Sequence, residues 1–298
     1  MGVAGRIVKK ISRIFQEPQI RERVVVRKVA GGSGQLPLKP GFIIGVYRSG
    51  TTLLRYVLDS HPHIAVPPES NFLLGLAETW RSEWYRKGLQ GVGVDDEGLR
   101  QRMRDFTGGI FDDYARAKEK QRWFDKTPSY IDALDFIDDT FGQECRYIML
   151  YRHGLDVANS MTNMQGNDVQ KGPGRKFAEL YPGSARLANA RYWVEQCEKM
   201  LAFEEAHPNQ CFRILYEQYS AEPEHYLPPM FEFLDEAWDA DVLNFSDKQH
   251  DFGLQDSKIL ENKGFVPNVN TYKSWPEEEV ARAWDIVGPT MEKLGYKI

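Results

Sequence analysis

Short apolar runs alternate with amphipathic stretches along most of the chain. The run from Phe42 to Tyr47 is apolar on both faces, and similar short runs span Arg146 to Tyr151 and Cys211 to Tyr216. Runs of this kind are typical of buried strands in a parallel sheet. We therefore predict three core strands in these segments.

Helical spacing follows each predicted strand. A helix from about Thr51 would place Leu53, Leu54, Val57 and Leu58 on one face. We predict further helices from Thr127-Pro128 to Gly142, near Leu155, over 185–205, at Pro223 and at Pro276. The last should kink or break at Gly288-Pro289, because proline removes a helical hydrogen bond. Strands that alternate with helices predict an α/β fold, a three-layer sandwich with a central parallel sheet.

Two segments interrupt this alternation. Residues 72–122 have a charged, helical pattern with glycine breaks, and residues 165–183 are rich in glycine, proline and lysine. We expect a helical insert in the first and a long loop in the second. The insert and its neighbourhood contain four large aromatic residues: Trp80, Trp84, Tyr85 and Trp123. These rings could stack on a sugar or phenol, and we expect them instead in the core of a helical cap.

The basic N-terminus differs from the rest of the chain. A Gly31-Gly32-Ser33-Gly34 linker predicts a division into an arm, residues 1–34, and a single domain, residues 35–298. Residues 1–28 hold eight basic and two acidic side chains, a net +6, so the other 270 residues carry −11. The arm has an apolar helical face: Ile7, Val8, Ile11, Ile14 and Phe15. This face could contact an anionic membrane surface, the body of the protein, or a partner subunit in a homodimer.

Composition excludes several classes of protein. With 42% apolar and 27% charged residues over 298 positions, the chain is neither disordered nor collagenous, and no apolar stretch is long enough to span a membrane. A net charge of −5 disfavours a nucleic-acid partner. The three cysteines are far apart and form no metal-binding pattern, so we predict no metal site and buried thiols in a reducing compartment. Because no apolar signal core follows the N-terminus, we expect a cytoplasmic protein, with peripheral membrane contact as an alternative.

A glycine-containing loop joins the first predicted strand to the first helix. Gly45 to Thr52 has the GxxxxG spacing of a P-loop, whose backbone N–H groups and following helix N-terminus form an anion cradle. Thr51 stands where the usual lysine would be, and Arg48 is the nearest cation. ATP- and GTP-dependent enzymes need that lysine and a carboxylate for Mg²⁺, whereas the second strand here ends in Tyr151-Arg152. This pattern favours transfer of a less charged group, such as sulfuryl.

These motifs resemble the family of sulfotransferases that use 3′-phosphoadenosine 5′-phosphosulfate (PAPS). Residues 48–52 resemble its 5′-phosphosulfate loop, and residues 146–160 resemble its 3′-phosphate motif, in which Arg152 and Ser160 would hold the 3′-phosphate. The resemblance implies PAPS as donor, adenosine 3′,5′-bisphosphate as product and no metal. It also implies an adenine contact for Tyr216 and a late basic contact for Lys263, and it makes Arg48, Ser49, Gly50, Thr51 and Thr52 cofactor-binding residues.

The catalytic residues are also implied by the resemblance, which is nearest to protein-tyrosine and heparan-type sulfotransferases. Glu69, after His61-Pro62-His63 and two prolines, matches their proposed base, and Lys126 matches a lysine that assists near the leaving group. Arg48 would stabilise the transition state through its guanidinium fork. Cytosolic small-molecule sulfotransferases use a histidine base instead, so His61 and His63 are the rivals of Glu69. We expect His61 to be a turn residue and His153 not to be the base.

The acceptor is a hydroxyl on a glycan, lipid, natural product or tyrosine, and we favour the first three. The helical insert and the loop 165–183 would form the acceptor side of the site. Two alternative functions are a P-loop kinase-like enzyme and a non-catalytic nucleotide-binding protein. The absent lysine and the lack of a carboxylate for Mg²⁺ oppose the kinase. The non-catalytic protein is opposed by the combined set of Arg48, Glu69, Lys126, Arg152 and Ser160.

Overall fold

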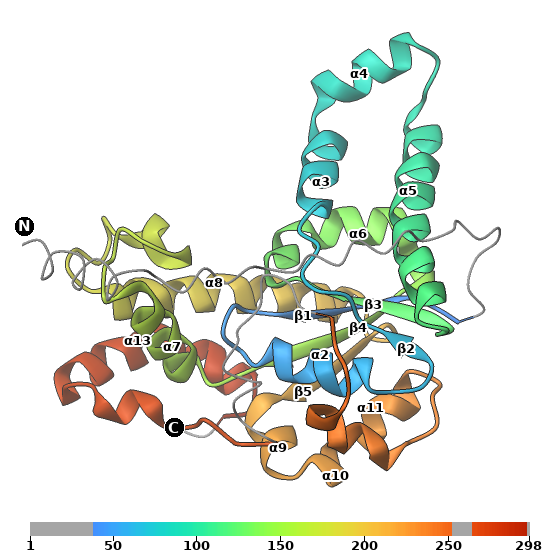
Figure 1. The fold of residues 1–298 in the computed structure, drawn as a ribbon. Coiled ribbons are helices and arrows are strands. Elements are labelled where there is room, and N and C mark those ends of the chain that lie inside the picture. The colour runs from blue at the N-terminus through green and yellow to red at the C-terminus, as the bar shows by residue number, and fades with distance from the viewer. Residues whose placement is uncertain (1–37, 252–263, 297–298) are drawn as a thin grey trace, which may run out of the picture. The chain divides into compact units, whose positions relative to one another are not determined.

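A five-stranded parallel sheet forms the centre of the domain. In this computed structural model, which describes residues 38–251 and 264–296, the strand order is β2-β3-β1-β4-β5 (Figure 1). The strands are β1 (Gly41–Gly45), β2 (Ile64–Ala65), β3 (Arg122–Lys126), β4 (Arg146–Tyr151) and β5 (Cys211–Leu215). Gly41 pairs with Phe124 on one side and with Arg146 on the other. The N-terminal arm, its linker and Lys263 lie outside the described residues.

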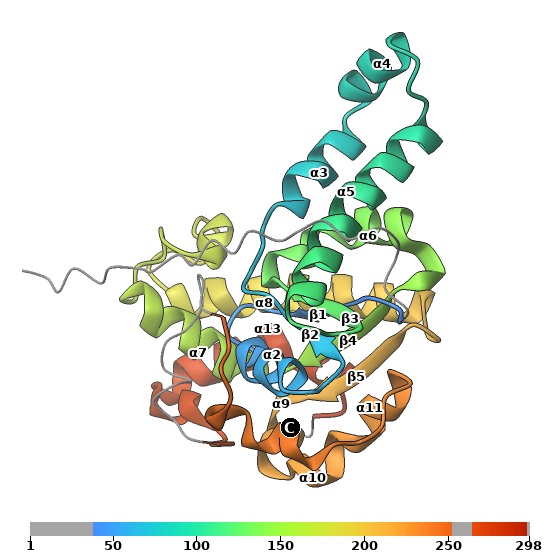
Figure 2. The same cartoon turned by 45° about the vertical axis from the view of Figure 1, so that its right-hand side comes forward.

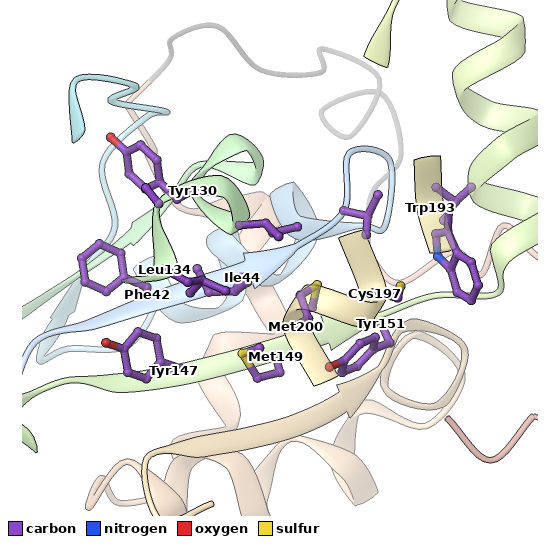
Figure 3. Packing of buried hydrophobic residues seen from close by; sticks show 14 of the residues in the cluster. Phe42, Ile44, Tyr130, Leu134, Tyr147, Met149, Tyr151, Trp193, Cys197 and Met200 are labelled. Atoms are coloured by element: carbon purple, nitrogen blue, oxygen red, sulfur yellow. The ribbon is translucent and has the colours of Figure 1, made fainter. Parts of the chain in front are cut away.

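Helices cover both faces of the sheet, which confirms the predicted three-layer α/β fold. Side chains of β1 alternate between two apolar clusters, so Phe42 and Ile44 lie in one and Ile43 lies in the other. The first cluster packs under α6 (Leu134–Phe141), α7 (Gly154–Gln165), α8 (Ala185–Ala206) and α13 (Glu277–Lys293). Figure 3 shows its centre, where the rings of Phe42 and Tyr147 are stacked and where α8 contributes Cys197 and Met200 to the same cluster.

The opposite face carries the helix that follows the P-loop. Helix α2 (Thr51–Asp59) is buried along its whole length and packs with α9 (Tyr216–Ala221), α10 (Pro223–Tyr226) and α11 (Pro228–Phe233) around the second cluster. The figures place α2 beside β1 and β2, with α9, α10 and α11 below the sheet (Figures 1 and 2). Because helices cover both faces, neither face of the sheet lies open to solvent, as is usual for parallel sheets.

A helical hairpin leaves the sheet between β2 and β3. It consists of α3 (Leu73–Arg81), α4 (Glu83–Gly91) and α5 (Asp96–Ala117), and it extends away from the sheet in both views (Figures 1 and 2). This confirms the predicted helical insert. Its aromatics were predicted wrongly in part, because Trp84 is 82% exposed and Tyr85 is 49% exposed, while Trp123 is in the core. Helix α4, which contains Trp84 and Tyr85, has no buried residue, so it has no core into which these two rings could pack.

Four of the predictions about elements need correction. Strands β2 and β3 were not predicted, and three of the five residues in β3 are charged. The helix expected from Thr127 begins as a 3-10 segment, Pro128–Ala133, and the Thr127 hydroxyl does not cap it. Helix α13 continues through Pro289, so of the predicted kink or break at Gly288-Pro289 the break does not occur. A 3-10 segment, Pro173–Phe177, also interrupts the predicted loop 165–183.

Candidate active site

The P-loop lies between the end of β1 and the start of α2. Gly50 has a φ of 90°, and a Cβ at this position would lie 2.4 Å from Cδ2 of Tyr216, so only glycine fits. Arg48 also has a positive φ, 70°, a conformation that non-glycine residues adopt at a cost and that recurs at functional sites. Ser49 is fully buried, and its hydroxyl has no hydrogen-bond partner among the residues that the structure describes. A phosphate or sulfate group in the loop would supply that partner, so the loop fits such a group.

Arg152 extends from the end of β4 to the P-loop. Its Nη1 donates to the carbonyl oxygen of Arg48 at 2.7 Å, and its guanidinium lies 4.5 Å from the ring centroid of Tyr216. The Tyr216 hydroxyl in turn accepts a hydrogen bond from the Asn268 amide at 3.2 Å. These contacts place a 96% buried cation, Arg152, directly beside the loop. The predicted adenine contact of Tyr216 stays a prediction.

Ser160 contacts the P-loop arginine, although the motif pairs it with Arg152. It accepts a hydrogen bond from Nε of Arg48 at 3.1 Å. Since Arg152 donates to the Arg48 carbonyl, the three residues form one connected group at the start of α2. The structure thus brings the predicted 5′ and 3′ anion sites together through Arg48.

Glu69 and Lys126 form an ion pair on the other side of the P-loop. Lys126 ends β3 and its side chain is fully buried, whereas the Glu69 side chain is 16% exposed. Nζ of Lys126 donates to Oε1 of Glu69. Burial lowers the pKa of Lys126, and the Glu69 carboxylate opposes this change. The pair therefore joins a solvent-accessible proton acceptor to a buried ammonium beside an anion site.

A second buried carboxylate, Asp125, precedes Lys126 and was missed from the sequence. Burial raises its pKa to about 6, and the nearby hydroxyls of Ser70 and Thr127 offset part of that rise. Within the described part of the chain, neither carboxylate oxygen has a well-aligned hydrogen-bond partner. The only signal in the sequence was its place beside Lys126 in Asp125-Lys126-Thr127-Pro128.

The histidine rivals do not occupy such positions. His61 follows the C-terminal end of α2, the end opposite the P-loop, where it stacks on Phe231 with 5.1 Å between ring centroids. This agrees with its predicted role in a turn. His153 is stacked on Tyr272, and burial lowers its pKa to about 4.

His61, His63 and Glu236 form a group that could hold a cation, and their contacts argue against that role. His61 Nε2 faces the Ala237 carbonyl at 3.1 Å, and its Nδ1 accepts the His63 amide at 3.3 Å. The Arg122 guanidinium lies 3.3 Å from Glu236, so the carboxylate is already compensated. The group thus stabilises the turn after α2.

The fold and these side chains define an α/β protein whose P-loop fits a phosphate or sulfate group and lies next to a carboxylate–ammonium pair. The model of the "Sulfotransferase family" matches residues 40–240, and the chain belongs to this family. The family implies PAPS as donor, and this decides against the kinase alternative. Among the residues that the structure describes, no helix is both long and apolar enough to cross a membrane.

Two relatives and one solved structure illustrate the similarity. Protein-tyrosine sulfotransferase A of Caenorhabditis elegans is 27% identical over 86% of this chain and 66% of its own length. Protein-tyrosine sulfotransferase 1 of Danio rerio is 25% identical over 86% of this chain and 71% of its own length. The sulfotransferase domain of the Synechococcus PCC 7002 olefin synthase shares the fold, with a TM-score of 0.59 and 20% identity over 91% of this chain and the whole of that domain.

Proposed function

We propose that the chain moves the sulfuryl group of PAPS to an acceptor hydroxyl. The observation that carries this proposal is the Glu69–Lys126 pair, which stands on one side of the P-loop while Arg152 stands on the other. A transferase needs a base for the acceptor proton and cations for the charge that develops on the donor. When bound, PAPS would supply an activated sulfuryl group, whose bond to the phosphate oxygen breaks as its bond to the acceptor oxygen forms.

Some of the site residues would bind the donor, and others would take part in the transfer of the proton and the sulfuryl group. We assign the 5′-phosphosulfate to Arg48 and the loop from Ser49 to Thr52, and the 3′-phosphate to Arg152 and Ser160. Glu69 would take the proton of the acceptor hydroxyl at its exposed carboxylate. Lys126, whose ammonium is held against Glu69, would stabilise the negative charge on the departing phosphate oxygen. Tyr216 and Lys263 complete the nucleotide site in this proposal, which includes no metal.

Tyrosine hydroxyls are the acceptor that the comparisons favour within the range of glycans, lipids, natural products and tyrosine. Two of the relatives are named protein-tyrosine sulfotransferases, and their similarity extends over 86% of this chain. The acceptor would approach on the β3 side of the P-loop, where α3 begins and the Glu69 side chain keeps 16% of its surface exposed. The sequence alone favoured a glycan, lipid or natural product, and the comparisons reverse that order.

Radiolabelled PAPS tests both the reaction and the acceptor. The protein would be incubated with [³⁵S]PAPS and with tyrosine peptides, sugars, phenols or an extract of the source cell, and the labelled product identified. Glu69→Gln should abolish transfer and leave binding of adenosine 3′,5′-bisphosphate within about twofold. Strong transfer by this variant would refute the base assignment. Nucleotide binding without transfer to any hydroxyl would instead support the non-catalytic alternative.

We also propose a cytoplasmic location. All three cysteines, Cys145, Cys197 and Cys211, are free thiols, and burial raises the pKa of each. Unpaired thiols are typical of reducing compartments. Contact of the arm with a membrane or a second subunit remains part of this proposal. Fractionation of cells that express the full chain, and of cells that express it without residues 1–34, tests both.

A further inference from the structure

Arg55 is a fully buried arginine in α2 that the sequence analysis did not single out. Its side chain is 0% exposed, and its Nε donates to two carbonyl oxygens, those of Val66 at 3.1 Å and Pro67 at 2.9 Å. Its Nη2 donates to the carbonyl oxygen of Asp251 at 2.9 Å. A buried charged group must be hydrogen-bonded, so the bonds from Arg55 to these main-chain carbonyls fix the backbone path at Val66, Pro67 and Asp251.

The segment that Arg55 holds leads directly to the proposed base. Only Pro68 separates Pro67 from Glu69, and both prolines have a fixed φ. Asp59, one helical turn after Arg55, accepts the Val66 amide at 2.9 Å, so α2 holds both main-chain polar groups of Val66. The position of α2 is thereby transmitted along a stiff chain to Glu69.

A second hold lies immediately after Glu69. The Ser70 amide donates to the Thr127 hydroxyl at 3.1 Å, and the Ser70 hydroxyl lies 2.7 Å from that of Tyr130. Thr127 is the residue after Lys126, so the Ser70–Thr127 bond is the direct neighbour of the Glu69–Lys126 pair. This side is fixed to the residue that follows β3, and on the other side Arg55 and Asp59 of α2 hold the segment that leads to Glu69.

We propose that Arg55 is a positioning residue, which acts through the Val66-Pro67 backbone to set the Glu69 carboxylate against Lys126. The role of Glu69 as base rests on the proposed function, whereas the position of its carboxylate does not. A guanidinium suits this role better than an ammonium, because its planar donors serve several carbonyls in fixed directions. Arg55 also lies close enough to Lys126 to contribute to the lowered pKa of that ammonium.

Two variants and a matched control test the proposal. Arg55→Met removes the donors, and Arg55→Lys keeps a charge and part of the hydrogen bonding. Arg122→Met is the control, because Arg122 is equally buried and donates to the Leu234 carbonyl at 2.6 Å, at the end of β3 away from Lys126. All three would be compared in thermal stability and in affinity for adenosine 3′,5′-bisphosphate.

Transfer from [³⁵S]PAPS to the acceptor found by labelling is the first readout. Arg55→Met should lower kcat about 10- to 100-fold, Arg55→Lys should lower it less, and Arg122→Met should leave it unchanged, with bisphosphate affinity within about twofold throughout. In a Glu69→Asp background, where the carboxylate is already displaced, Arg55→Met should cost no more than about threefold. Equal losses in the two backgrounds would mean that Arg55 does not act through Glu69 and would overturn the proposal.

Exchange of the Lys126 Nζ protons with water, followed by NMR, is a readout that needs no acceptor. Loss of the ordered contact with Glu69 should speed this exchange at least about tenfold in Arg55→Met and less in Arg55→Lys, but not in Arg122→Met. If wild-type protein transfers no sulfate, the proposed function fails and this exchange rate still decides the role of Arg55. An unchanged rate in both Arg55 variants would overturn the proposal; if Arg55→Met does not fold, Arg55→Lys decides alone.

Discussion

Removal of the Glu69 charge should destabilise the protein, because Lys126 would remain buried without its carboxylate. The Lys126 side chain is 0% exposed and Glu69 accepts its hydrogen bond. An unfolded lysine titrates near pH 10.4, so discharging Lys126 at about pH 7 costs at most roughly 4–5 kcal/mol. The glutamine carbonyl can still accept a hydrogen bond, and water reaches position 69, so we expect Glu69→Gln to cost about 1–3 kcal/mol.

The reverse substitution should cost less. Lys126→Met removes the buried charge and largely fills its space, while Glu69 keeps 16% of its side-chain surface in contact with solvent. We expect Glu69→Gln to be the more destabilising of the two by at least about 1 kcal/mol at about pH 7. Urea unfolding of the two variants and of wild type, followed by circular dichroism, measures this difference.

The pH dependence of Glu69→Gln has a definite sign. Burial lowers the pKa of Lys126 in the folded state, and loss of Glu69 lowers that pKa further. Above the folded pKa the unfolded chain binds more protons than the folded chain, so stability rises with pH until the unfolded lysine titrates. The penalty of Glu69→Gln should therefore shrink by up to about 1.4 kcal/mol per pH unit over this range. A penalty that grows from about pH 7 to about pH 9.5, or no penalty at all, would refute the reasoning.

Three further predictions concern the nucleotide site and α2. Position 50 has a left-handed backbone, and the Cβ that Gly50→Ala adds would clash with the Tyr216 ring. This variant should weaken binding of adenosine 3′,5′-bisphosphate at least about tenfold by calorimetry, and unchanged affinity would contradict the prediction. Arg152→Met should weaken the bisphosphate about 100-fold and AMP, which lacks the 3′-phosphate, less than about threefold; equal losses would argue against the 3′ assignment. The pKa of Asp59 is lowered to about 2, against its burial, by a hydrogen bond from His250 and by Lys120, so Asp59→Asn should cost about 2 kcal/mol above about pH 4. Wild type should lose this contribution as pH falls from about 4 through about 2, which acid unfolding of both proteins measures.

The longer apolar strands were predictable from the sequence, and the charged strand β3 was not. Strands β1, β4 and β5 have apolar runs, and their predicted and observed bounds differ by at most two residues at either end. Strand β3 was missed because Arg122, Asp125 and Lys126 are fully or almost fully buried in it. Their partners include Glu236 and Glu69, which are more than 50 residues away, so no local pattern could indicate the strand.

The site shows the same limit. Motif spacing indicated Arg48, Glu69, Lys126 and Arg152, and the structure places all four at the carboxyl ends of strands or in the segments that follow them. Their mutual contacts could not be predicted from spacing. The motif pairs Ser160 with Arg152, yet the Ser160 hydroxyl accepts from Arg48. Arg55 carried no signal, because an arginine in an otherwise apolar helix is also the pattern of a solvated surface residue.

The strand order explains why Arg152 and the Glu69–Lys126 pair lie on opposite sides of the P-loop. The P-loop follows β1, whose neighbours are β3 on one side and β4 on the other, so the chain diverges from β1 in both directions. In open parallel sheets ligands bind at such a point, beyond the carboxyl ends of the strands. Lys126 ends β3 and Arg152 follows β4, so a nucleotide bound at Arg152 would direct its sulfuryl end toward Lys126. An acceptor that reaches Glu69 must then approach from the β3 side, opposite the departing phosphate, as in-line transfer requires.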